Sequence, residues 1–149
     1  MPPIQTPNIY STSGGEGETT YLLLHGLGAT GDVWHGVRDI IEEKKLGRWI
    51  IPDMRGHGRS AHSDMYGIAN HAADMAALVA DTDDLYLAGH SMGGYGTSRI
   101  GMKHADMFGA LYMMSPCCLS PRDPAQVDPA ALKGLEAVKK PADSAGLPF

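Results

Sequence analysis

The chain has 149 residues, of which 43% are hydrophobic and 19% charged, and its formal net charge is −5. This length allows one domain with a single sizeable core, and we expect residues 1–149 to form it. The negative charge and the lack of a Lys/Arg cluster argue against nucleic acid or an anionic membrane surface as a partner.

The N-terminal residues predict little regular structure. Residues 1–10 lack the basic start and the apolar stretch of a signal peptide. No apolar run in the chain approaches the roughly 20 residues of a membrane-spanning helix. We therefore expect a cytoplasmic protein that does not enter the membrane. Residues 11–18, STSGGEGE, are rich in turn formers, and at most one short strand is expected near Ile9 and Tyr10.

The next segments alternate between strand and helix patterns. TYLLLHG, residues 20–26, is an apolar run closed by glycine, which indicates a strand covered on both faces. Residues 31–44 predict a helix. RWIIPD, residues 48–53, predicts a second buried strand, and the glycine-rich loop MRGHGRS follows it. The expected apolar face of the first helix consists of Val33, Val37, Ile40 and Ile41.

The alternation continues to the end of the chain. Residues 67–83 predict a helix, DLYLAGH (84–90) a third buried strand, residues 93–108 another helix and GALYMMSP (109–116) a fourth strand. Asp128 and Pro129 suit the start of a final amphipathic helix over residues 129–140. Strands that alternate with helices predict an α/β fold, a mostly parallel sheet with helices on both faces.

Three glycine-rich loops, HGLGATG, RGHGRS and HSMGG, directly follow the first three buried strands. Right-handed crossovers place the carboxyl ends of parallel strands at one edge of the sheet. Ligands of open α/β sheets bind at that edge. The three loops therefore predict an active site there.

The third loop holds the strongest motif. Residues 89–93, Gly-His-Ser-Met-Gly, match the G-x-S-x-G nucleophile elbow between a buried strand and a helix. Glycines flank the serine because neighbouring chains pack too closely for side chains. The motif predicts Ser91 as a nucleophile at a helix N-terminus, where backbone N–H groups favour a developing negative charge. The alternative is a structural serine that caps the helix.

An acyl-transfer serine also needs an oxyanion hole. The N–H of Met92, directly after the serine, is the first expected donor. The second is expected from the loop after the first buried strand, from the N–H of Leu27. One such donor is worth about 10²–10³ in rate. We interpret His25 as a residue that fixes this loop.

The motifs LLLHGLGATGDVW, IIPDMRGHGRS and LAGHSMGG resemble those of the α/β-hydrolase superfamily, in its esterase, lipase and peroxidase-like branch. The stretch from Ser91 to Leu119 is more similar to the esterase branch that includes S-formylglutathione hydrolase-like enzymes. The resemblance extends from about Thr19 to Leu119. It implies hydrolysis of a carboxylic ester, or a close relative, through an acyl-serine intermediate.

The family's triad has the order serine, acid, histidine, with the acid and the histidine after later strands. This sequence offers one more strand after Ser91, and it therefore resembles a truncated hydrolase. Its only later histidine, His104, is predicted at the opposite edge of the sheet. For the acid, Asp123 or Asp128 after the last strand could serve, while Asp53 and Asp32 are expected to hold loops.

The base remains open. His57 in RGHGRS is predicted at the correct edge and is the candidate that we carry forward. His90 is expected to pack beside the nucleophile and His71 to be solvated or to cap its helix. His35 and His62 flank loops that could fold over the site, and a second protomer could also supply the base.

The sequence thus predicts a serine hydrolase of small carboxylic esters, weak because its triad is incomplete. The alternative is an inert protein of this fold that binds a small apolar ligand or a partner chain, and a perhydrolase or lyase is a third possibility. The histidines lack the spacing of metal ligands, and neither a metal nor an organic cofactor is expected. The last strand is expected to be an edge that pairs with another copy of the chain, or to be covered by the terminal helix.

Overall fold

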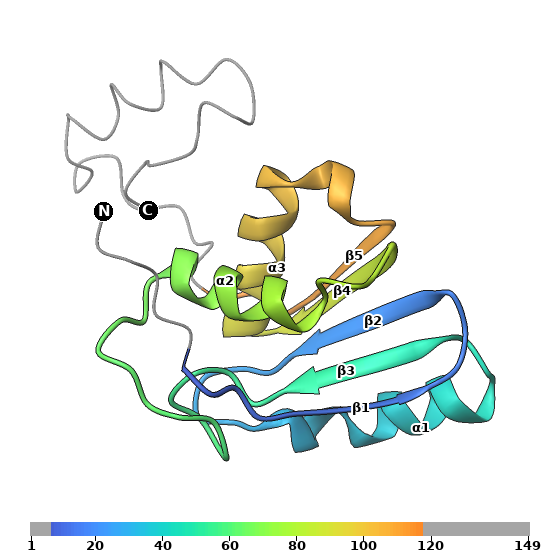
Figure 1. Cartoon of the computed structure of the whole chain (residues 1–149), viewed down its shortest axis with the longest axis horizontal. Coiled ribbons are helices and arrows are strands. Elements are labelled where there is room, and N and C mark those ends of the chain that lie inside the picture. Colours follow the sequence, from blue (N-terminus) through green and yellow to red (C-terminus); the bar gives the residue numbers. More distant parts are fainter. Residues whose placement is uncertain (1–6, 118–149) are drawn as a thin grey trace.

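The computed structural model describes residues 7–117 (Figure 1). Its helices and strands follow the predicted alternation closely. The strands are β1 (Ser11–Gly15), β2 (Thr19–Leu24), β3 (Arg48–Pro52), β4 (Asp84–His90) and β5 (Ala110–Met114). The helices are α1 (His35–Glu43), α2 (Ile68–Leu78) and α3 (Met92–Lys103), with 3-10 turns at Gly31–Trp34 and Ala105–Met107. The predicted helix over residues 129–140 lies outside the described residues.

The five strands form one sheet in the order β1-β3-β2-β4-β5. β2 to β5 pair in parallel, and β1 is antiparallel to β3. Helix α1 covers one face of the sheet, and α2 and α3 lie over the other (Figure 1). The predicted fold class, a mostly parallel sheet with helices on both faces, is confirmed.

The first strand is not where the sequence places it. It is formed by the glycine-rich Ser11–Gly15 instead of residues near Ile9 and Tyr10. A side chain on Gly14 would lie 2.7 Å from a ring carbon of Trp49 in β3. The glycine is therefore required by close packing, which strand propensities do not report.

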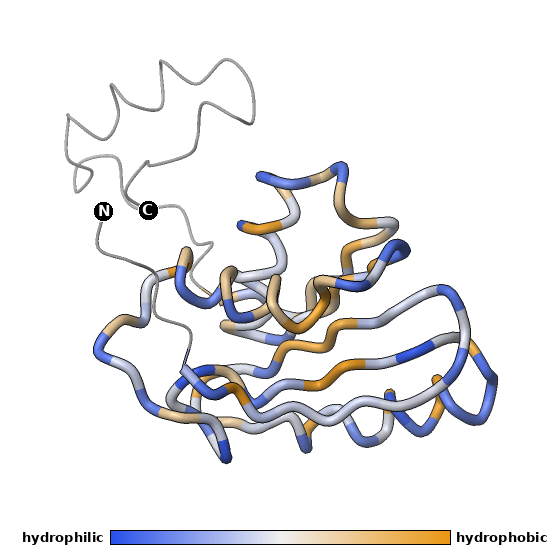
Figure 2. Tube along the Cα trace, in the orientation of Figure 1, coloured by the Kyte–Doolittle hydropathy of each residue, from blue (hydrophilic) through white to orange (hydrophobic). Residues whose placement is uncertain are grey.

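The larger core lies between the sheet and α2 and α3. Leu22 of β2 pairs in register with Leu87 of β4, which pairs with Leu111 of β5. Met75 of α2 and Val79, which follows the helix directly, cover this row, and both are buried. Figure 2 shows the hydrophobic stretches of the strands in the middle of the molecule and hydrophilic residues at the turns.

The second core lies under α1, and here the predicted helix face is partly wrong. Trp34 and Ile41 are buried against the sheet. Val33, Val37 and Ile40, expected in the core, are exposed. The helix is turned toward β3, where Glu42 accepts a hydrogen bond of 2.9 Å from Trp49 Nε1. Of the four residues predicted to face the core, only Ile41 therefore packs on the sheet.

β5 is an edge strand of the described sheet and is poorly covered. Tyr112 is 64% exposed, and Met113 and Met114 are also exposed. On the face of the sheet that α1 covers, no helix formed by residues 7–117 lies over β5 (Figure 1). None of the described helices is long and apolar enough to cross a bilayer.

Candidate active site

Ser91 lies between the end of β4 and the start of α3, at the carboxyl edge of the sheet. Its backbone has φ 53° and ψ −113°, a conformation that residues other than glycine rarely adopt. Such a residue is strained by about 1–3 kcal/mol and persists only where its surroundings enforce it. Here Ser91 N donates to Met114 O at 2.9 Å, and Tyr95 N donates to Ser91 O at 2.9 Å.

The side chain of Ser91 is partly exposed and makes no capping hydrogen bond to α3. A structural cap would accept a bond from the N–H groups of the first turn. The interpretation of Ser91 as a helix cap is therefore wrong. The hydroxyl is left at the rim, available to a ligand.

Close packing explains both glycines of the motif. A side chain on Gly93 would lie 2.7 Å from the carbonyl oxygen of His25 and closer still to that of Leu24. A side chain on Gly89 would strike the carbonyl of Gly93 and lie 2.5 Å from Thr97 Oγ1. The start of α3 is therefore pressed directly against the end of β2, and this contact aligns Ser91 with the first loop.

The first loop begins with a tight turn over residues 26–29. Ala29 N donates to Gly26 O at 3.2 Å, and Gly28 has φ +73°, as position three of a type II turn requires. In this turn the N–H of Leu27 takes no part in the closing bond, and Leu27 is 76% exposed. The N–H of Met92, as the first residue of α3, has no acceptor within the helix.

His25 fixes this loop, in agreement with its interpretation from the sequence. Its side chain is fully buried, its Nδ1 lies 2.7 Å from Gly26 O, and Met54 N donates to its Nε2 at 2.8 Å. Nδ1 therefore carries the proton. Burial lowers the pKa of His25, which keeps the ring neutral. Both ring nitrogens are used, so His25 cannot serve as a base for Ser91.

Asp53 holds the first and second loops together. Gly31 N donates to its Oδ1 at 2.7 Å, and Arg59 donates to its Oδ2 through both N and Nε at 2.9 Å. Burial alone would raise the pKa of Asp53, but the bonds from Arg59 and Gly31 lower it to about 2. Asp32 accepts from Arg59 Nη2 at 3.1 Å. Both aspartates hold loops, as the sequence indicated.

A buried ion pair connects the second loop to α2. Arg55 Nε and Nη2 donate to the two carboxylate oxygens of Asp74 in α2 at 2.7 and 2.8 Å, and both side chains are fully buried. Arg55 Nη2 also donates to Asn70 O at 3.0 Å. The roles of Arg55 and Arg59 were not predicted from the sequence. Their signal was present, because two arginines flank the glycines of RGHGRS.

His57, the predicted base, lies in this second loop. Its ring is edge-on to that of His25, with the centroids 5.1 Å apart, and its Nδ1 lies 3.1 Å from Arg55 O. If Nδ1 carries the proton, Nε2 is left as an acceptor. Within residues 7–117, however, no side chain forms a hydrogen bond with Ser91 Oγ. The structure therefore leaves the His57 prediction untested.

The remaining histidines differ in position. His71 is half-buried, and its Nδ1 is buried without a partner in the described structure, so it is not the solvated residue that we expected. Burial and the nearby Arg55 lower the pKa of His71. His90 is exposed instead of packed. His104 ends α3 at the far edge of the sheet, as predicted. Asp123 and Asp128 lie outside the described residues.

Metal chemistry has no obvious donor set here. Among residues 7–117, no three His, Cys, Asp or Glu side chains gather in a way that could hold a metal ion. The carboxyl edge instead brings the hydroxyl-bearing Ser91 against the backbone of the Gly26 loop, and both arginines of the second loop are paired with carboxylates.

The chain is similar to known hydrolases. It is 34% identical over 133 residues to the pimeloyl-[acyl-carrier protein] methyl ester esterase of Yersinia pseudotuberculosis, which covers 86% of this chain and 49% of that protein. The structure superimposes on an esterase from Thermogutta terrifontis with a TM-score of 0.68 and 27% identity, over 78% of this chain and 43% of that one. It also superimposes on the thioesterase domain from the curacin biosynthetic pathway, with a TM-score of 0.69 and 26% identity, over 78% of this chain and 45% of that one.

The chain therefore spans about half the length of the relatives that it matches. The family model described as "Alpha/beta hydrolase family" matches residues 21–148. This match begins within β2 and includes the glycine-rich loops and the serine turn. The chain belongs to the alpha/beta hydrolase family.

Proposed function

We propose that this protein is a serine hydrolase that acts on small carboxylic esters through an acyl-serine intermediate. One observation carries the proposal: Ser91 is held in a strained turn at the carboxyl edge, with its hydroxyl free of any capping bond and its Cβ against the Gly26 loop. Relatives that are named as esterases and a lipase support hydrolysis of esters.

In the proposed reaction, Ser91 Oγ loses its proton to a base and forms a bond to the acyl carbon of the ester. The N–H groups of Leu27 and Met92 donate to the oxygen that becomes negative. The bond from the acyl carbon to the alcohol oxygen then breaks, and the alcohol leaves with the proton. Water attacks the acyl-serine in the same way, and a carboxylic acid leaves Ser91 free.

His57 is our candidate for the base, with Nδ1–H donating to Arg55 O and Nε2 accepting the proton of Ser91. Asp123 remains the candidate acid. In the described structure Ser91 Oγ has no such partner, and we therefore propose weak turnover. In a serine protease, loss of the base costs about 10⁶ in kcat, while the oxyanion hole and binding leave about 10³–10⁴ over the uncatalysed reaction.

The second candidate function is a binding protein without turnover. It is favoured by the same lack of an imidazole on Ser91 Oγ among residues 7–117. Such a protein would still expose the serine, but it would not cycle through an acyl intermediate. Steady release of product, beyond one equivalent, separates the two functions.

The test is labelling with a fluorophosphonate, followed by steady-state hydrolysis of p-nitrophenyl acetate. We expect labelling and turnover that Ser91→Ala abolishes and that Ser13→Ala, at an exposed position of β1, leaves unchanged. His57→Gln is expected to lower turnover at least tenfold and to leave folding intact. Labelling that survives Ser91→Ala would show that Ser91 is not the nucleophile. Labelling without turnover would favour the binding protein.

A further inference from the structure

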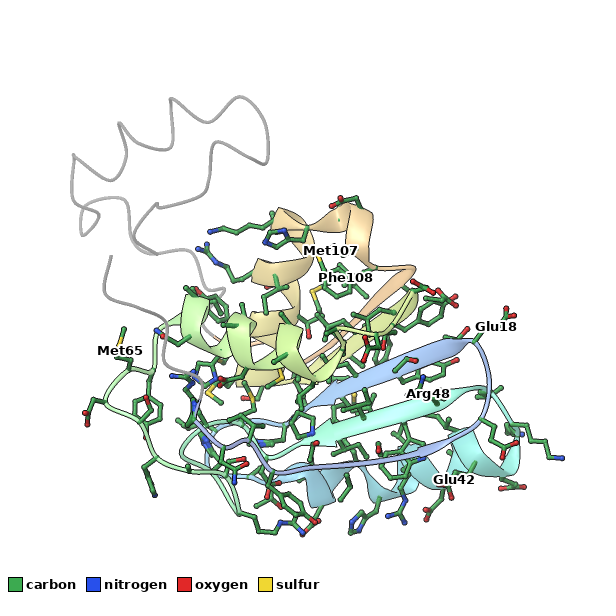
Figure 3. The ribbon with its side chains drawn as sticks, in the orientation of Figure 1. Glu18, Glu42, Arg48, Met65, Met107 and Phe108 are labelled. Atoms are coloured by element: carbon green, nitrogen blue, oxygen red, sulfur yellow. The ribbon has the colours of Figure 1, made fainter. Side chains whose placement is uncertain are left out.

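An apolar cavity lies between α2, α3 and the sheet, away from the serine turn. It is about 330 Å³ in volume and is lined on the sheet side by leucines of β2 and β4. On α3 it begins at Ile100, nine residues after Ser91, which is about 13 Å along a helix. Figure 3 labels Met107 and Phe108, which line the cavity where α3 ends. None of the residues to which we assign a role in the proposed reaction lines this cavity.

The walls of this cavity are almost entirely apolar. α2 contributes small side chains, including Ala72 and Ala73, which leave the space unfilled. The only imidazole in the lining is that of His104. Larger apolar residues form the remaining walls, among them Leu22, Leu87, Met75, Val79, Ile100 and Phe108. A lining of this kind suits an alkyl chain and no polar ligand.

A second hollow of about 230 Å³ adjoins the first, and the two share Ala69, Ala72, Ile100 and His104. This outer hollow is lined by two cationic residues, Arg99 and Lys103, which lie one helical turn apart on α3. In the described part of the chain, no Asp or Glu lines either hollow. The inner cavity is therefore apolar, and the outer hollow carries the basic side chains of Arg99 and Lys103.

We propose that this site binds the anion of a medium-chain carboxylic acid. The alkyl chain would occupy the inner cavity, and the carboxylate would lie at the mouth beside Arg99 and Lys103. The volume sets the length, because a methylene fills about as much space as a water molecule, roughly 30 Å³. About eight carbons fit with room to spare. The proposal does not depend on catalysis at Ser91.

The test is titration of the full chain with sodium octanoate at low salt, followed by calorimetry. Ala72→Phe fills the cavity where the two hollows meet and should weaken binding at least about tenfold. Ala77→Phe, at an exposed position of α2 that lines neither hollow, is the matched control and should have no effect. Lys103→Glu should weaken binding by about twofold to fivefold, and Lys44→Glu, directly after α1, should leave it unchanged.

A second measurement needs no substitution. Octanoate should shift the methyl NMR signals of Met75 and Met107, which line the cavity, and leave that of Met113 on β5 unchanged. Ser91→Ala should bind octanoate as the unmodified chain does, whether or not the protein is an esterase. No binding at millimolar octanoate, or binding that Ala72→Phe leaves intact with unshifted Met75 and Met107, would overturn the proposal.

Discussion

Gly26 and Ser91 are in direct contact across the carboxyl edge of the sheet: a side chain on Gly26 would lie 3.1 Å from Ser91 Cβ. The two residues follow neighbouring parallel strands, since Leu24 of β2 pairs with Gly89 of β4. His25 fixes the Gly26 carbonyl from one side, and the start of α3 presses on the same loop from the other. The position of Ser91 relative to the first loop is thus set by backbone packing.

The first prediction tests this contact with two glycines of α3. Gly93→Ala places a methyl group against the carbonyl oxygens of Leu24 and His25, and should destabilise the protein by about 1–3 kcal/mol and abolish labelling of Ser91. Gly96→Ala is the control, because nothing lies within 4 Å of its added methyl group. It should stabilise α3 by about 0.5–1 kcal/mol and retain labelling. Urea unfolding and fluorophosphonate labelling measure both effects. Equal behaviour of the two variants would contradict the role of Gly93.

The serine turn could be predicted from the sequence because its constraints are local. Gly89, Ser91 and Gly93 stand between a buried strand and a helix, and each residue type is dictated by backbone contacts within that unit. The same locality explains why β2 to β5 and the helices of the described residues were predicted within five residues of their observed bounds.

Features that depend on distant packing could not be predicted in this way. Val33 is apolar and in phase with Ile41, yet it is exposed, because the orientation of α1 follows from Trp34 and Trp49 filling the space above β3. The pairing of Asp53 with Arg59 depends on how the second loop folds back on itself. The identity of the base requires the position of a side chain relative to Ser91, which spacing in the sequence does not provide.

The second prediction concerns the pH dependence of Asp53. Its pKa is about 2 in the folded protein against an ordinary 3.8, so the carboxylate stabilises the fold above about pH 4 and this contribution is lost as the pH falls toward 2. Asp53→Asn should lower the free energy of unfolding at pH 7 by about 2 kcal/mol. The difference from the unmodified protein should shrink between pH 4 and pH 2.5.

Asp32→Asn is the matched control, because Asp32 also binds Arg59 but is exposed. Its effect at pH 7 should stay below about 1 kcal/mol. Urea denaturation at pH 7, 4 and 2.5 gives all three values for each variant. A constant difference between Asp53→Asn and the unmodified protein across this range would show that the carboxylate charge is not what holds the loops.

The third prediction compares a buried ion pair with an exposed one. Asp74→Ala leaves the guanidinium of Arg55 buried without its carboxylate and should destabilise the protein by about 3–5 kcal/mol. Asp39→Ala removes the partner of Arg38 at the surface and should change stability by less than about 1 kcal/mol. Thermal unfolding of the two variants tests the contrast. A small effect of Asp74→Ala would mean that water or the chain reorganises to solvate Arg55.

The last prediction concerns the edge strand. β5 ends the described sheet, and its exposed Tyr112 and Met114 extend a face that α1 does not reach. Unpaired backbone groups beside exposed apolar side chains favour pairing with another strand. We propose that two copies of the chain associate through β5, and we expect a dimer at about 50 µM by light scattering, within the micromolar range of modest interfaces.

Tyr112→Lys should shift the dimer to the monomer, because a charge would then lie inside the paired face. Met102→Lys, at a more exposed position on α3, should leave the dimer intact. A monomer at this concentration, or a dimer that Tyr112→Lys does not weaken, would exclude association through this edge.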